Sequence, residues 1–77
     1  MEKIQILGST TLIGNHFTQK NSKKFDLNCY SREQKGYNYL DVNDIKSIVN
    51  YSFYNSYIVS FLPVWLTLEF FKNLEEL

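Results

Sequence analysis

The sequence predicts an α/β domain that forms the N-terminal half of a doubly wound parallel sheet. Short runs of alternating or continuous apolar residues indicate strands, and between them apolar residues recur at helical spacing. The connections are short, and the order is strand, helix, strand, strand, helix, strand, helix. We therefore expect a three-layer α/β/α arrangement with an incomplete sheet.

Length and composition limit what the chain can be. Its 77 residues fit one small domain, residues 1–77. Hydrophobic residues make up 44% of it and aromatic residues 17%, which is too apolar for a disordered segment. Polar residues interrupt the apolar runs too often for a membrane span. Eight basic residues balance eight acidic ones, so no long-range field attracts nucleic acid or an anionic membrane. We expect neither as a partner.

Cysteine and histidine are scarce in this chain. Cys29 is the single cysteine, which excludes an internal disulfide, and the single histidine, His16, has no neighbours at metal-ligand spacing. We assign no metal site. The N-terminus lacks the basic stretch, apolar run and cleavage site of a signal peptide. Together these features predict a cytoplasmic protein.

The first strand is predicted at Lys3 to Leu7, where polar and apolar residues alternate. A helix is expected from about Leu12 to Asn21. Its apolar stripe would consist of Leu12, Ile13 and Phe17, with polar residues on the opposite face.

Apolar residues alternate again from Phe25 to Cys29 and predict a second strand that ends at Tyr30-Ser31. Glu33 to Gly36 form a polar turn, and Tyr37 to Leu40 are expected to form a short third strand. Asp41 then stands where the N-cap of a second helix is wanted.

Three elements are predicted in the rest of the chain. Residues 45–49 have the spacing of a helix face, and Tyr57 to Leu62 form an apolar run typical of a strand covered on both faces. Pro63 ends that strand, and we expect Trp65 to pack against the sheet edge. The last helix is predicted from apolar residues at helical spacing: Leu66, Phe70, Leu74 and Leu77.

The segment from Gly8 to Gly14 lies between the first strand and the first helix, where a dinucleotide-binding fold places its phosphate loop. Gly8 permits a tight turn, and the small Ser9 and Thr10 let a pyrophosphate approach backbone amides at the positive end of the helix. Gly14 lets the helix pack close to the sheet. An ordinary strand-to-helix turn with two glycines fits equally well.

This loop resembles the Gly-x-x-Gly-x-x-Gly fingerprint of the short-chain dehydrogenase/reductase superfamily, in particular its extended and atypical members of the NAD-dependent epimerase/dehydratase type. The resemblance covers the whole chain and implies an NAD(P)-binding Rossmann fold. Thr11 occupies the place of the central glycine, where a Cβ crowds the closest approach of the pyrophosphate.

The resemblance also implies which cofactor is bound. Ser31 and Arg32 fall at the end of the second strand, where an acidic residue would select the ribose hydroxyl of NAD. A hydroxyl and a guanidinium suit a 2′-phosphate, which favours NADP over NAD, although Glu33 next to them keeps NAD open. A solvated surface charge is the alternative interpretation of Arg32.

Two further segments match the family. Asp41 and Val42 resemble the aspartate and apolar neighbour that meet the adenine, although an N-cap alone would also explain Asp41. The end of the fourth strand is where relatives place small or apolar residues against the ribose, although core packing explains it too. The predicted cofactor-binding residues are Gly8, Ser9, Thr10, Thr11, Leu12, Ile13, Gly14, Ser31, Arg32, Asp41, Val42, Phe61, Leu62 and Pro63.

Members of this superfamily transfer hydride with a Tyr-x-x-x-Lys pair, and no tyrosine of this chain is followed four residues later by lysine. We therefore expect a nucleotide-binding portion of an epimerase- or reductase-like protein that is not catalytic by itself. The alternative is a non-catalytic α/β remnant or interaction module with weak or no nucleotide binding. An unpaired sheet edge predicts self-association or pairing with a missing C-terminal half.

Overall fold

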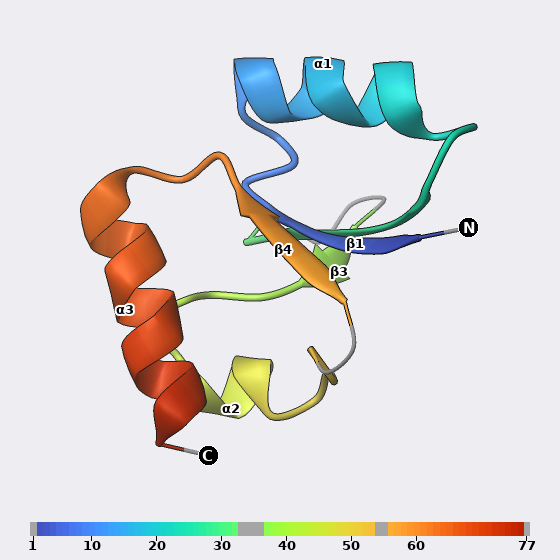
Figure 1. The fold of residues 1–77 in the computed structure, drawn as a ribbon. Helices are drawn as coiled ribbons and strands as arrows, with labels where there is room; N and C mark the ends of the chain where they lie inside the picture. The colour runs from blue at the N-terminus through green and yellow to red at the C-terminus, as the bar shows by residue number, and fades with distance from the viewer. Residues whose placement is uncertain (1, 33–36, 54–55, 77) are drawn as a thin grey trace.

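The computed structural model describes residues 2–32, 37–53 and 56–76 (Figure 1). The predicted turn at 33–36 and Leu77 lie outside this range. Four parallel strands form one sheet in the order β3-β2-β1-β4, with the bounds β1 (Lys3–Leu7), β2 (Asp26–Ser31), β3 (Asn38–Tyr39) and β4 (Tyr57–Ser60). The helices are α1 (Leu12–Asn21), α2 (Ile45–Ile48) and α3 (Val64–Glu75). The α/β class, the parallel sheet and the order of elements are confirmed.

The central strand β1 separates the two faces of the sheet. Ile6 pairs in register with Cys29 and Val59, whereas Leu7 pairs with Tyr30 and Ser60. Because successive side chains of a strand point to opposite faces, these two sets lie on opposite sides. α1 lies on one side of the sheet, and α2 and α3 lie on the other (Figure 1). The three layers are therefore present. None of these helices is long and apolar enough to cross a membrane.

The core lies on the side of α2 and α3. The rings of Tyr30, Phe53 and Phe70 pack in series, with centroids 5.5 Å and 5.2 Å apart, in the tilted and edge-on geometries that aromatic pairs prefer. α3 contributes the face that its periodicity predicted, with Leu66 and Leu74 packed beside the buried Phe70. The buried cluster consists of Leu7, Tyr30, Leu40, Val42, Ile48, Phe53 and Phe70.

A polar residue, Gln5, is buried at the centre of the sheet beside this core. Its Oε1 accepts a hydrogen bond from the hydroxyl of Tyr30 at 2.6 Å, and its Nε2 donates to the carbonyl of Ser52 at 3.2 Å. Both ends of the amide are thus satisfied. Burial, together with smaller contributions from the neighbouring Tyr51 and Cys29, raises the pKa of Tyr30 to about 12, so the phenol stays protonated and donates at neutral pH.

α1 has the predicted bounds, but its predicted stripe is wrong for Leu12 and Ile13, which are 88% and 68% exposed. Phe17 does pack, with its ring 5.3 Å from that of Phe61. The reason is that Gly14 is buried against the loop before the helix. This contact turns Gly14 and the residues three and four after it inward, and it turns Leu12 and Ile13 outward.

Three further expectations about local structure are corrected. The N-cap of α2 is Asp44, whose carboxylate accepts from the amide of Lys46 at 3.1 Å, because Asp44 directly precedes the helix in an extended conformation. Asp41 lies one turn earlier. β4 ends at Ser60, two residues earlier than predicted, and its faces are only partly covered, because Tyr57 is 63% exposed and the other three residues are half-buried. Trp65 is 71% exposed and does not pack on the sheet edge.

Candidate functional site

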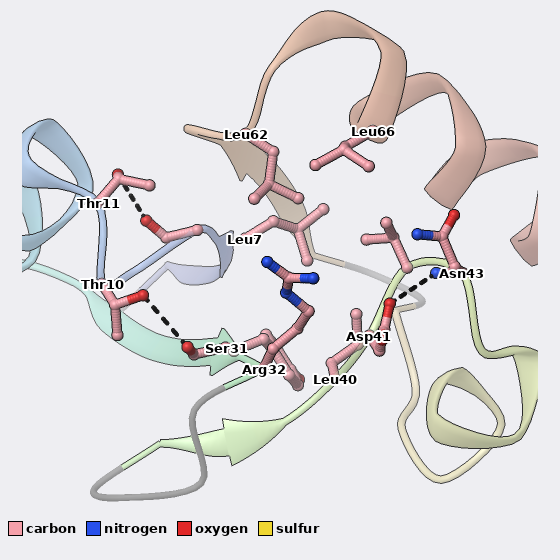
Figure 2. A pocket seen from close by; sticks show the side chains of 13 residues that line it. Leu7, Thr10, Thr11, Ser31, Arg32, Leu40, Asp41, Asn43, Leu62 and Leu66 are labelled. Atoms are coloured by element: carbon pink, nitrogen blue, oxygen red, sulfur yellow. Dashed lines mark hydrogen bonds between the residues drawn. The ribbon is translucent and has the colours of Figure 1, made fainter.

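A cleft of about 400 Å³ opens at the carboxyl edge of the sheet (Figure 2). The ends of β1 and β2, the segment after β3 and the connection between β4 and α3 form its walls. In open α/β sheets, ligands bind outside the carboxyl ends of the strands, which makes this cleft the candidate site. The predicted residues that line it are Gly8, Thr10, Thr11, Ser31, Arg32, Asp41, Val42 and Leu62.

The other predicted residues lie elsewhere. Ser9 is fully buried, and its hydroxyl donates to the carbonyl of Ile6 at 3.2 Å, so it faces the interior. Phe61 packs against Phe17 on the α1 side. The remaining positions outside the cleft lining are the exposed Leu12, Ile13 and Pro63 and the buried Gly14.

The cleft also contains residues that the sequence analysis did not select: Leu7, Tyr30, Leu40, Asn43 and Leu66. Leu7 is the last residue of β1 and Tyr30 the last but one of β2, so their place at strand ends could have identified them. Leu66 comes from α3, and no local pattern in the sequence connects it with the loop after β1.

Gly8 adopts φ = 76°, in the left-handed region that favours glycine. A Cβ at this position would lie 3.1 Å from Cδ2 of Leu62 and 3.2 Å from the Leu62 nitrogen, closer than side chains normally approach. Both the backbone angle and the space therefore require glycine here. The predicted tight turn is confirmed.

Gly14 and Thr11 close the loop from the other end. A Cβ on Gly14 would overlap the carbonyl oxygen of Gly8, which confirms that this glycine allows a close approach of the helix. Thr11 is the N-cap of α1: its Oγ1 accepts from the Gly14 amide at 3.1 Å and donates to the Gly8 carbonyl at 2.8 Å. Thr11, which stands at the central glycine position of the Gly-x-x-Gly-x-x-Gly fingerprint, thus stabilises the loop through two hydrogen bonds.

Polar groups gather where the loop meets the end of β2. The hydroxyls of Thr10 and Ser31 are 3.2 Å apart and join the loop to the strand (Figure 2). Arg32 follows directly, and its guanidinium extends over the cleft. It forms no hydrogen bond or ion pair with any residue in 2–32, 37–53 or 56–76. A planar, always charged group with free donors suits a phosphate or carboxylate.

The opposite wall combines a carboxylate with apolar side chains. Asp41 accepts from the amide of Asn43 at 3.0 Å, which fixes a turn and leaves further acceptor capacity on the carboxylate. Leu62 and Leu66 lie across the cleft from Leu40 (Figure 2). Such walls suit a flat apolar ring that has a polar edge.

Over the described part of the chain, no three His, Cys, Asp or Glu side chains come together as a metal site. No protein-family model matches the chain, and comparison with curated proteins and with solved structures finds no match either. A functional assignment therefore depends on the geometry of the cleft and on the sequence motifs.

Proposed function

We propose that the cleft binds a dinucleotide, NADP in preference to NAD, as the cofactor-binding portion of an epimerase- or reductase-like protein of the short-chain dehydrogenase/reductase type. The observation that supports this most is Arg32, a cation without a described partner at the mouth of a cleft on the carboxyl edge of a parallel sheet.

Each wall of the cleft would hold one part of the ligand. The turn at Gly8 and the amides of Leu12 and Ile13, the first two of α1, would face the pyrophosphate, because no intrahelical carbonyl can reach these amides. Arg32 and the hydroxyls of Thr10 and Ser31 would bind the 2′-phosphate. Asp41 would accept from the exocyclic amine of the adenine. The chain lacks a Tyr-x-x-x-Lys pair, so we propose binding without hydride transfer by this chain alone.

The test is a calorimetric titration of NADP and of NAD. NADP should saturate the protein, and Arg32→Ala should raise its Kd about 10- to 100-fold, which corresponds to losing a charge-assisted hydrogen bond. The same variant should change the affinity for NAD much less, because NAD has no 2′-phosphate.

Lys24→Ala is the matched control, because Lys24 is also an exposed cation but lies before β2, at the opposite edge of the sheet. It should leave NADP binding unchanged. An absence of saturable binding at millimolar NADP would overturn the proposal.

A second function is favoured by one observation. Thr11 and Leu62 both crowd the turn at Gly8, Thr11 through its hydrogen bond and Leu62 through its side chain. A loop that satisfies its own polar groups has less need of a ligand, which supports a non-catalytic interaction module. Thr11→Gly distinguishes nucleotide binding from the interaction module. The variant should bind NADP more tightly than the wild type if the loop is a crowded phosphate site. It should show no NADP binding if the module has lost that function.

A further inference from the structure

The wall of the cleft that carries Asp41 belongs to no helix or strand. Leu40 to Asp44 connect the end of β3 at Tyr39 to the start of α2 at Ile45. A carboxylate can discriminate between ligand atoms only if it is held to within about 0.5 Å of the productive position. In a connecting segment this precision must come from side chains that hold the backbone, because no regular ladder of hydrogen bonds does so.

One hydroxyl, that of Ser47 in α2, holds both polar groups of the Asp41 backbone. Its Oγ accepts from the Asp41 amide at 3.0 Å, and its hydrogen is directed to the carbonyls of Asp41 and Asp44, at 2.9 Å and 2.7 Å. The bond to Asp44 is the local one that a helical serine often makes to the preceding turn. Asp41 lies six residues earlier, so its two contacts are not part of that pattern. Ser47 is only 5% exposed, which shields these bonds from water.

The side chain of Asp41 is fixed by the residue that follows the next one. Its Oδ1 accepts from the Asn43 amide at 3.0 Å (Figure 2). Nothing in residues 2–32, 37–53 and 56–76 donates to Oδ2, which is therefore the oxygen available to a ligand. Because Ser47 holds the backbone and Asn43 holds the carboxylate, Asp41 has one orientation at the cleft.

The next residue of the wall is held independently of Ser47. Nδ2 of Asn73, in α3, donates to the carbonyl of Val42 at 2.7 Å, and the side chain of Val42 is buried in the core. Removing the Ser47 hydroxyl should therefore release Asp41 and leave the apolar part of the wall in place.

We propose that Ser47 is a positioning residue that gives this cleft a preference for adenine, because it holds Asp41 where the carboxylate meets an exocyclic amine. The inference rests on the proposed nucleotide binding. A base with a carbonyl at that position places one acceptor against another, and two acceptors form no hydrogen bond. Without the hydroxyl, the amide and carbonyl of Asp41 lose their partner. The cleft then loses its preference between bases rather than all of its affinity.

The test compares NADP with deamino-NADP, in which hypoxanthine replaces adenine and a carbonyl replaces the exocyclic amine. The wild type should bind deamino-NADP about 10- to 100-fold more weakly, as expected for the loss of a hydrogen bond to a charged group. Ser47→Ala should lower this ratio to less than about threefold by weakening NADP binding, with little change in the affinity for deamino-NADP.

Ser56→Ala is the matched control. The Ser56 hydroxyl also donates to a backbone carbonyl, that of Phe53 at 3.1 Å, but Ser56 directly precedes β4 and so lies at the amino edge of the sheet. This variant should leave both affinities unchanged.

Two further measurements distinguish positioning from a general loss of structure. Asp41→Asn should abolish the ratio, because an amide can accept from an amine or donate to a carbonyl, and adding Ser47→Ala should then change the ratio no further. In the wild type without nucleotide, the Asp41 amide should exchange slowly with solvent, because its partner is a buried hydroxyl.

The outcomes separate the role of Ser47 from nucleotide binding. An unchanged ratio in Ser47→Ala, with both nucleotides weakened equally or not at all, overturns the role of Ser47 and leaves nucleotide binding standing. So does rapid exchange of the Asp41 amide in the wild type. A wild type that binds neither nucleotide overturns nucleotide binding itself, and the role of Ser47 with it.

Discussion

On the side of α2 and α3, the helices are joined to the sheet by a cluster of interlocked aromatic and aliphatic side chains, whereas α1 on the other side is positioned largely by a close backbone contact. Phe53 and Phe70 are buried among aliphatic residues on the first side. On the second side, Ile4 and Ile6 of β1 are buried, but α1 is held by Gly14 against the Gly8 carbonyl, and its leucine and isoleucine face outward. Apolar burial thus stabilises both faces of the sheet, with the aromatic cluster on one of them only, and capping and close approach position α1 on the other.

The candidate site lies on the boundary between these two sides. Its loop belongs to the α1 side and is positioned by glycines and the Thr11 cap. Its apolar wall belongs to the core side, through Leu40 and Leu66. A ligand there would contact residues from both sides of the sheet, so a change in the packing of either side should alter the geometry of the cleft.

The largest expected difference between the two sides is in apolar burial. Phe70→Ala should lower the free energy of unfolding by about 3 to 5 kcal/mol, because the fully buried ring leaves a cavity. Phe17→Ala, which removes a half-buried ring of α1, should lower the free energy of unfolding by about 1 kcal/mol, well below the value for a fully buried ring. Urea denaturation measures both. Equal losses would contradict the comparison.

Gly14→Ala tests the close approach on the α1 side. Alanine normally stabilises a helix interior relative to glycine, by about 0.5 to 1 kcal/mol. Here the added Cβ would overlap the Gly8 carbonyl, so we expect the opposite sign, a loss of about 1 to 3 kcal/mol. Thermal unfolding measures it, with Asn15→Ala, an exposed position on the same helix, as the control. A stabilised Gly14→Ala protein would show that α1 is not held by this contact.

The smallest expected effect concerns the buried hydrogen bond of Tyr30. Its pKa is raised from 10.0 to about 12, so it contributes stability that is complete below pH 10 and is lost as the pH rises toward 12. Tyr30→Phe should remove that part of the alkaline loss of stability. Tyr57→Phe, at an exposed tyrosine, should retain it. Denaturation midpoints measured between neutral and alkaline pH decide the matter, and identical pH profiles for the two variants would refute the assignment.

Much of the local structure could be predicted because it depends on near neighbours in the chain. The bounds of β1 and α1 are those expected, since alternation and the Gly8 turn delimit them. The inward face of α3 follows from its spacing alone. The N-cap of α2 was misplaced because Asp41 and Asp44 are both suitable side chains, and the choice between them depends on where the chain turns.

The candidate site was predictable in so far as its residues follow strand ends, as Thr10, Arg32 and Asp41 do. Leu66 was not, because its place in the cleft depends on the packing of α3. Nor was the orientation of α1, whose exposed Leu12 and Ile13 have the composition of a buried face.

The sequence by itself determined the class of fold, the order of the elements and the turn at Gly8, since these depend on periodicity and on the backbone freedom of single residues. The tertiary structure decided which side of α1 faces the sheet, that β4 is at one edge of the described sheet, and that Arg32, Asp41 and the leucines line one cleft. Those outcomes depend on contacts between segments far apart in the chain, which no local pattern encodes.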